Sequence, residues 1–210
     1  MTRASAVWPP GATSRRALRA ASACVLLAVA AGCATVAPLQ APAAATVDPA
    51  FDVAGRISAR RGSEAVTANF AWAHSPRDDR FDVSTPLGQV IARLTGDASG
   101  VRVERPGESP VAYADWGALT HSVFGVAIPV HGLASWIQGA PSAGTVSAVE
   151  TDASGRPLVL REQGWEIVYA YADANAAAPA RPFRLVMRYP DSEPIEVRIV
   201  VDRWSAVAAH

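Results

Sequence analysis

The chain has 210 residues, half of them hydrophobic, and its 19 basic residues balance its 19 acidic residues. Every basic residue is an arginine, and the arginines form no dense block, so nucleic acid is not an expected partner. About 160 residues lie beyond the first fifty, which is enough for one domain with a hydrophobic core.

The first 32 residues predict a lipoprotein signal peptide that is cleaved. Three arginines within residues 15–19 give a positive start, residues 20–31 form an uncharged apolar run, and small residues lead into Cys33. This order is typical of a secretory signal, and the run is too short to span a bilayer, which needs roughly 20 residues. A cysteine directly after small residues indicates lipoprotein processing, because the peptidase must fit small side chains beside a diacylated thiol. Ala30 takes the position where leucine is usual.

Cys33 is therefore expected to be the first mature residue and the lipid anchor, and an ordinary secretory signal with an incidental cysteine is the alternative. Cys24 leaves with the leader, so the mature chain has no internal disulfide. Residues 33–50 predict a lipidated N-terminus and a flexible tether, because they are rich in alanine and proline and lack aromatic residues. Ala34 is compatible with transport to the outer membrane, where the anchor would hold the chain on the periplasmic face.

Residues 51–210 predict one mainly β domain, because apolar and polar residues alternate with a period of two. Turn residues such as glycine and proline separate the runs, and short strands at this spacing indicate a sandwich or barrel. The alternating runs are 51–60, 66–72, 81–84, 101–104, 165–171, 183–189 and 195–202.

The middle of the chain predicts two short helices. Asp115 is placed to cap one that runs through Phe124, and residues 131–138 form another that stops at Gly139. Each has an apolar face, so the helices are expected to cover a curled sheet as a plug or lid. These faces comprise Leu119, Val123 and Phe124, and Leu133, Trp136 and Ile137.

An ordered set of short motifs resembles the LolB family of outer-membrane lipoproteins over about residues 51–204. The motifs are Gly55-Arg56-Ile57, Phe70-Ala71-Trp72, Thr85-Pro86-Leu87-Gly88-Gln89, Gly125 with Ile128-Pro129-Val130, Leu133 with Trp136-Ile137 and Gly139, Gln163-Gly164-Trp165 with Tyr169, and Trp204. The resemblance implies an incomplete antiparallel β-barrel of about eleven strands, with helices over an apolar cavity. Family members carry a longer helical segment before the first strand, whereas residues 34–50 here are short and broken by prolines.

The resemblance also implies a function, which is to receive lipoproteins from the periplasmic carrier LolA and insert them into the outer membrane. The expected partners are a LolA-like carrier, acylated cargo and outer-membrane lipid, with a monomeric protein and no cofactor. Exposing acyl chains to water costs about 0.8 kcal/mol per CH₂, so a sixteen-carbon chain resists transfer by roughly 12 kcal/mol. An apolar slot is therefore required. The aromatic residues expected to shape it are Phe70, Trp72, Trp136, Trp165, Tyr169 and Trp204.

Two alternatives concern these residues. Inward-facing aromatic residues are most often ordinary packed core, and the resemblance does not say which rings touch lipid.

The expected membrane insertion loop consists of Pro86, Leu87 and Gly88, because the matching leucine of the family sits on a protruding loop. Proline and glycine predict a turn at this place. The alternative is that Leu87 folds back onto the sheet.

An enzyme is not expected. The four histidines lack metal-ligand spacing, no nucleophile elbow or phosphate loop is present, and Asp78-Asp79 is typical of a solvated turn. A lipoprotein of the same fold that carries free lipid, a glycolipid or a signalling partner is the stronger alternative. A cavity that is apolar throughout and a protruding Leu87 loop favour the LolB function, whereas a buried charge in the slot favours a polar ligand.

Overall fold

The computed structural model describes residues 47–125, 127–145, 147–173 and 180–207. The predicted signal peptide, Cys33 and most of the predicted tether lie outside these residues. In the described part of the chain, no helix is long and apolar enough to cross a membrane.

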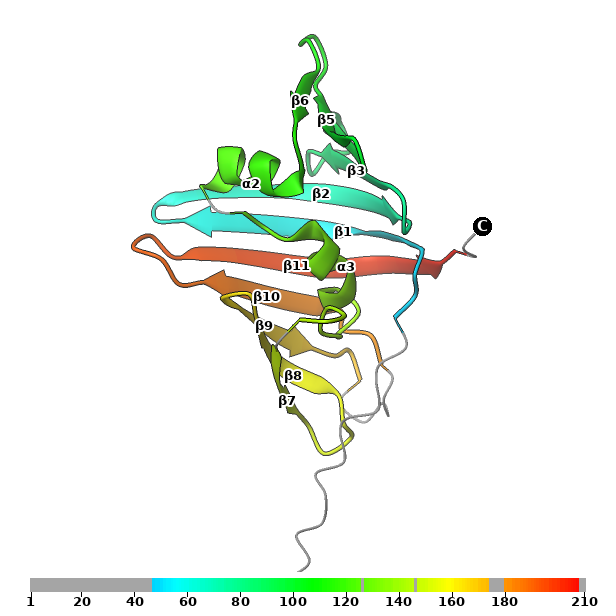
Figure 1. Ribbon diagram of the computed structural model, residues 1–210, viewed down its shortest axis with the longest axis vertical. Helices are drawn as coiled ribbons and strands as arrows, with labels where there is room; N and C mark the ends of the chain where they lie inside the picture. Colours follow the sequence, from blue (N-terminus) through cyan, green and yellow to red (C-terminus); the bar gives the residue numbers. More distant parts are fainter. Residues whose placement is uncertain (1–46, 126, 146, 174–179, 208–210) are drawn as a thin grey trace, which may run out of the picture. The chain divides into compact units, whose positions relative to one another are not determined.

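Eleven strands make one antiparallel sheet (Figure 1). The strands of the first half are β1 (Phe51–Arg61), β2 (Glu64–His74), β3 (Asp79–Ser84), β4 (Val90–Asp97), β5 (Gly100–Glu104) and β6 (Val111–Tyr113). Those of the second half are β7 (Ser147–Thr151), β8 (Pro157–Glu162), β9 (Trp165–Ala170), β10 (Arg184–Tyr189) and β11 (Ile195–Ala206).

The sheet order is β6-β5-β4-β3-β2-β1-β11-β10-β9-β8-β7, so the first and last strands pair at its centre. The two edge strands, β6 and β7, are consecutive along the chain, and they lie at opposite ends of the sheet order. The segment between them contains both described helices, and this segment has to cross the open side of the sheet. An open antiparallel sheet of this size, with helices on one side, confirms the predicted fold class.

The two faces of the sheet differ because apolar and charged residues alternate along each strand. In β1, Phe51 and Val53 are buried, whereas Asp52 and Arg56 are exposed. The outward face carries ion pairs between neighbouring strands, such as Arg56 with Asp202 at 2.9 Å. Exposed pairs of this kind contribute little to stability, so burial of the inward face holds the fold together.

The helices are α2 (Trp116–Phe124) and α3 (Val130–Trp136), labelled as in Figure 1. The carboxylate of Asp115 accepts a 2.7 Å hydrogen bond from the backbone N–H of Ala118, which confirms the predicted cap. Gly125, with a φ of 72°, ends α2 in the left-handed conformation that glycine favours. The prediction that Val123 belongs to a buried face is wrong: its side chain is 55% exposed, because α2 packs on β5 and β6 through its first half.

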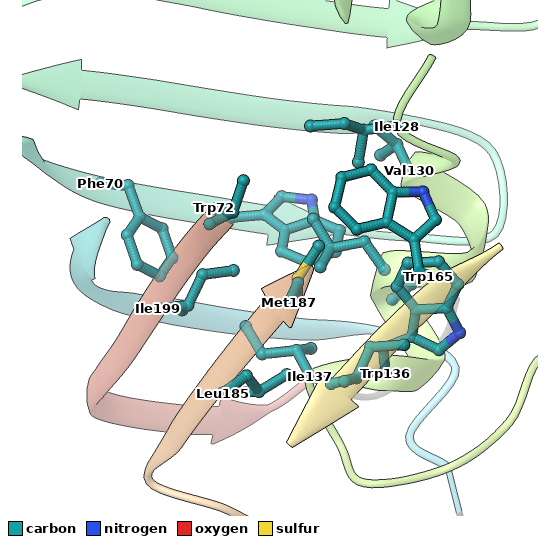
Figure 2. Packing of buried hydrophobic residues seen from close by; sticks show 14 of the residues in the cluster. Phe70, Trp72, Ile128, Val130, Trp136, Ile137, Trp165, Leu185, Met187 and Ile199 are labelled. Carbon is teal, nitrogen blue, oxygen red and sulfur yellow. The ribbon is translucent and has the colours of Figure 1, made fainter. Parts of the chain in front are cut away.

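The core lies between the helices and the inward face of the sheet (Figure 2). Trp136 and Ile137 from the α3 region form one buried cluster with side chains from the central and later strands, including Trp72, Trp165 and Leu185. The inward alternation predicted from the sequence is confirmed for these strands. Val66 is an exception at 56% exposure, because it lies close to the tip of the β1–β2 hairpin.

Candidate functional site

The six aromatic residues predicted to shape an apolar slot all belong to the helix-covered core. Five are buried: Phe70, Trp72, Trp136, Trp165 and Tyr169 are each at most 8% exposed, and Trp204 is half-buried against them. Ring contacts place Trp72 and Trp204 in a row across the central strands, and Trp136 and Trp165 in a second group at α3. Phe70 and Tyr169 lie in the same core outside these two sets of ring contacts.

The aromatic row crosses four strands and ends at α2. Trp204 stacks on Phe51 at a centroid distance of 4.4 Å, and Phe51 meets Trp72 edge-on at 5.0 Å. Trp72 stacks on Phe81 at 4.6 Å, and Phe81 meets Trp116 edge-on at 5.3 Å. Phe51, Phe81 and Trp116 were not among the predicted site residues. The inward alternation of Phe51 and Phe81 and the place of Trp116 after the Asp115 cap are the signals that would have found them.

The α3 group consists of Trp136, Trp165 and Tyr189. The ring centroids of Trp136 and Trp165 are 6.5 Å apart, and those of Trp165 and Tyr189 are 5.2 Å apart. These rings present a large apolar area with few rotamers, so they form a surface that keeps its shape.

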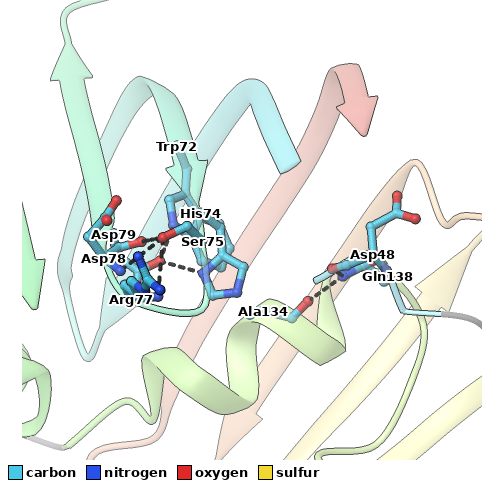
Figure 3. Close-up of polar contacts among 9 residues, drawn as sticks. All are labelled: Asp48, Trp72, His74, Ser75, Arg77, Asp78, Asp79, Ala134 and Gln138. Carbon is cyan, nitrogen blue, oxygen red and sulfur yellow. Dashed lines mark hydrogen bonds and ion pairs between the residues drawn. The ribbon is translucent and has the colours of Figure 1, made fainter. Parts of the chain in front are cut away.

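A buried carboxylate fixes the centre of the aromatic row (Figure 3). Asp79 is 4% exposed, and its Oδ1 accepts a 2.8 Å hydrogen bond from Nε1 of Trp72 and lies 2.7 Å from Nδ1 of His74. The prediction that Asp78-Asp79 forms a solvated turn is correct for Asp78, which is exposed, and wrong for Asp79. Asp79 begins β3 and faces inward, where the buried indole N–H of Trp72 needs an acceptor.

Asp48 connects the start of the domain to α3. Its backbone N–H donates a 2.8 Å hydrogen bond to Oε1 of Gln138, and Nε2 of Gln138 donates to the Asp48 carbonyl at 3.2 Å (Figure 3). The Asp48 carboxylate accepts hydrogen bonds from Nε1 of Trp204, at 3.3 Å, and from Arg181. The chain that enters β1 is therefore held both by the end of α3 and by the aromatic row.

The loop predicted for membrane insertion is a tightly hydrogen-bonded hairpin between β3 and β4. The backbone N–H of Gly88 donates to the carbonyl of Thr85, and the N–H of Thr85 donates to the carbonyl of Gln89, both at 2.8 Å. Gly88 has a φ of 87°, which fits glycine at this position of the turn. Leu87 is 98% exposed, so it does not fold back onto the sheet.

The apolar surface of this loop extends beyond the predicted residues. Val90 and Ile91 at the start of β4 are each 41% exposed, and every residue from Pro86 to Ile91 is exposed. Apolar residues grouped at a protruding tip gain nothing for folding and are typical of a surface that meets lipid or a partner. The sequence signal for this extension was the apolar pair that directly follows the turn.

A groove of about 580 Å³ crosses the central strands of the sheet. Its lining includes the small residues Ala54, Ala71 and Ala73 and the charged residues Arg80 and Arg203. Two of the predicted slot residues, Trp72 and Trp204, border the same groove, so its lining is mixed and not apolar throughout. Within the described residues, no group of three or more His, Cys, Asp or Glu side chains is placed to hold a metal ion.

Comparisons with known proteins agree with this architecture. The family described as outer membrane lipoprotein LolB matches residues 49–204. The outer-membrane lipoprotein LolB of Thiobacillus denitrificans is 35% identical over 176 residues, which cover 83% of this chain and 91% of that protein. The LolB of an Azoarcus species is 34% identical over 191 residues, covering 90% of this chain and 96% of that protein.

The solved structure of a LolA superfamily protein from Nitrosomonas europaea has a similar fold, with a TM-score of 0.50 at 9% sequence identity. The similarity covers 79% of this chain and 90% of that one. The family match spans nearly all of the described sheet and both helices, and the relatives align over most of their own length. The chain belongs to the LolB family of outer-membrane lipoproteins.

Proposed function

We propose that this chain receives acylated lipoproteins from a LolA-like periplasmic carrier and inserts them into the outer membrane. The observation that carries the proposal is Leu87, which is 98% exposed at the tip of a hydrogen-bonded hairpin on a chain of the LolB family. Cys33 holds the protein on the periplasmic face of that membrane. The family is one of lipoprotein receptors and not of enzymes, in agreement with the sequence analysis.

Acceptance uses the apolar space between the sheet and the helices. The acyl chains of the cargo stay out of water throughout the transfer, because each exposed CH₂ costs about 0.8 kcal/mol. The aromatic row and the α3 group supply the apolar surface, and α3 has to move aside for a chain to lie against Trp136 and Trp165. The hydrogen bonds between Gln138 and Asp48 tie the end of α3 to the start of the domain, so α3 moves as an attached lid.

Delivery uses the β3–β4 loop. Full burial of a leucine side chain is favourable by about 1.5–3 kcal/mol, so Leu87 gains from entering the apolar layer of the bilayer. Val90 and Ile91 continue this apolar surface toward the sheet. The hairpin hydrogen bonds hold the Leu87 side chain in its exposed position, so the loop does not have to refold before it contacts the membrane.

Acceptance is tested with a lipid-free form that lacks residues 1–33, so that neither the leader nor the anchor is present. The purified form is mixed with an equal amount of LolA loaded with a triacylated lipoprotein, and the cargo on each protein is measured after separation. The proposal expects most of the cargo to move to this chain. Cargo that stays on LolA contradicts the proposal, and analysis of lipids that copurify with the protein would then identify another ligand.

A further inference from the structure

Four buried polar atoms near the end of α3 have no hydrogen-bond partner among the described residues. They are Nε1 of Trp136, Oγ of Ser142, Oε1 of Glu162 and the hydroxyl of Tyr169. The parent side chains of Trp136, Glu162 and Tyr169 are at most 5% exposed. Buried polar atoms in native proteins nearly always have partners, so four in one region need an explanation.

These atoms belong to one neighbourhood. The backbone N–H of Ser142 donates a 3.0 Å hydrogen bond to Oε2 of Glu162, which leaves Oε1 of the same carboxylate unpaired. Ser142 and Trp136 both pack against Gly132: a Cβ there would lie 3.2 Å from Oγ of Ser142 and 3.1 Å from Cζ2 of Trp136. Across the β8–β9 hairpin, Glu162 pairs with Trp165, whose ring faces Trp136.

Tyr169 comes from β9, where it is buried on the same inward face as Trp165. Burial raises the pKa of its hydroxyl well above the usual range, and the nearby Tyr171 and Glu162 raise it further. The hydroxyl therefore keeps its proton and is a hydrogen-bond donor. With the indole N–H of Trp136 and the hydroxyl of Ser142, the region offers three donors, and Oε1 of Glu162 adds one acceptor.

We propose that Trp136, Ser142, Glu162 and Tyr169 bind the ester and amide groups that join acyl chains to the N-terminal cysteine of the cargo. This inference rests on the proposed function and names the part of the cargo that the site recognises. Ester and amide carbonyl oxygens accept from the three donors, and the amide N–H of an acylated cysteine donates to Oε1 of Glu162. The acyl chains extend from there over the apolar side chains beneath α3, where Ile137, Leu185 and Met187 lie (Figure 2).

The arrangement also explains why a carboxylate lies inside an apolar core. A leucine at position 162 would suit the core better, and unpaired buried groups destabilise a fold. Such local conflicts between sequence and fold are expected where a ligand supplies the missing partners. The linking groups of a lipoprotein are the polar part of a cargo whose remaining anchor is apolar, so a mixed site suits them.

The test compares two probes that differ only in carbonyl groups: a fluorescent diacylglycerol with ester links and its dialkyl ether analogue of equal chain length. Affinities are measured for the purified full-length protein and for two variants, Tyr169→Phe and Tyr171→Phe. Tyr171 is the matched control, since its hydroxyl donates a 2.8 Å hydrogen bond to the Pro157 carbonyl and is not among the unpaired groups.

The wild type is expected to bind the ester probe more tightly than the ether probe. Tyr169→Phe is expected to weaken binding of the ester probe about tenfold, which is about 1.4 kcal/mol, and to leave the ether probe within about twofold. Its melting temperature is expected to stay equal or rise, because an unpaired hydroxyl is removed. Tyr171→Phe is expected to lower the melting temperature and leave the ester-to-ether ratio unchanged.

Equal binding of both probes by the wild type, or an equal loss of both in Tyr169→Phe, would overturn this inference and leave the proposed function standing. Binding of neither probe would contradict both, because an acceptor of acyl chains has to bind at least the ether probe.

Discussion

The indole N–H of Trp72 donates a 2.8 Å hydrogen bond to the carboxylate of Asp79, inside the core and beside His74. This contact orients the central ring of the aromatic row, because Trp72 also stacks on Phe81 and meets Phe51 edge-on. The row thus depends on one polar side chain that the core encloses. Loss of that side chain leaves a buried donor without an acceptor.

Replacement of Asp79 is expected to destabilise the fold. Asp79→Ala should lower the free energy of unfolding by about 2–3 kcal/mol, because the hydrogen bonds of a buried charged acceptor are lost. Urea denaturation followed by tryptophan fluorescence measures the change. Asp78→Ala is the control, since Asp78 is exposed, and it should change stability by less than about 0.5 kcal/mol. Equal effects of the two variants would show that the Trp72–Asp79 contact does not stabilise the row.

Gly96 provides the space in which α2 docks. A Cβ on Gly96 would lie 2.6 Å from Cε2 and Nε1 of Trp116, so Gly96→Ala is expected to push α2 away and lower stability by about 1–3 kcal/mol. Gly96→Ala should cost less stability when it is made in Trp116→Leu than when it is made in the wild type, because the smaller leucine side chain leaves room for the methyl group. Calorimetry of the four proteins gives the coupling free energy. If the stability losses of the two single substitutions simply add in the double variant, the effect of Gly96→Ala does not come from its contact with Trp116.

Stability at low pH is expected to depend on Asp82. The hydrogen bond from Arg93 lowers the pKa of Asp82, and the charges of Arg93 and Arg80 lower it further. A carboxyl group whose pKa is lowered by folding stabilises the fold above its unfolded pKa of about 3.9, and this contribution is lost as the pH falls below that value. The stability difference between wild type and Asp82→Asn should therefore be largest near neutral pH and shrink below about pH 4. A difference that stays constant down to pH 2 would contradict this assignment.

The lipid anchor remains a prediction from sequence. Mass spectrometry of the membrane-extracted protein is expected to show a mature N-terminus at Cys33 with acyl chains attached. Cys33→Ser should remain unprocessed, because the peptidase acts on a lipidated cysteine. A mature chain that starts at another residue and carries an unmodified Cys33 would show that the leader is an ordinary secretory signal.

Local patterns predicted most elements of the fold and less of the site. Inward alternation located β1, β2, β9, β10 and β11, and Asp115 located the start of α2. Val66 and Val123 were predicted to be buried but are exposed. The period of a strand or helix shows which face is apolar, but it does not show where that element extends beyond the residues it packs against.

Long-range relationships had no local signal. The central pairing of β1 with β11 joins residues from opposite ends of the domain, such as Phe51 with Ala206, and the sequence analysis did not predict it. Asp79 was misjudged because its neighbours are typical of a turn. The unpaired polar atoms of Trp136, Ser142, Glu162 and Tyr169 come from separate segments, so only the folded chain brings them together.

Delivery of cargo into a membrane by the Leu87 loop is the central claim, and one transfer assay tests it most directly. LolA loaded with a triacylated lipoprotein is mixed with the full-length protein in liposomes, and cargo is measured both on the protein and in the lipid. Leu87→Glu is compared with Gln89→Glu, which adds the same charge to an exposed position of the same loop. The expected result is that Leu87→Glu still takes cargo from LolA but delivers less than about a tenth of the wild-type amount, whereas Gln89→Glu delivers normally. Normal delivery by Leu87→Glu, or an equal loss in both variants, would contradict the account.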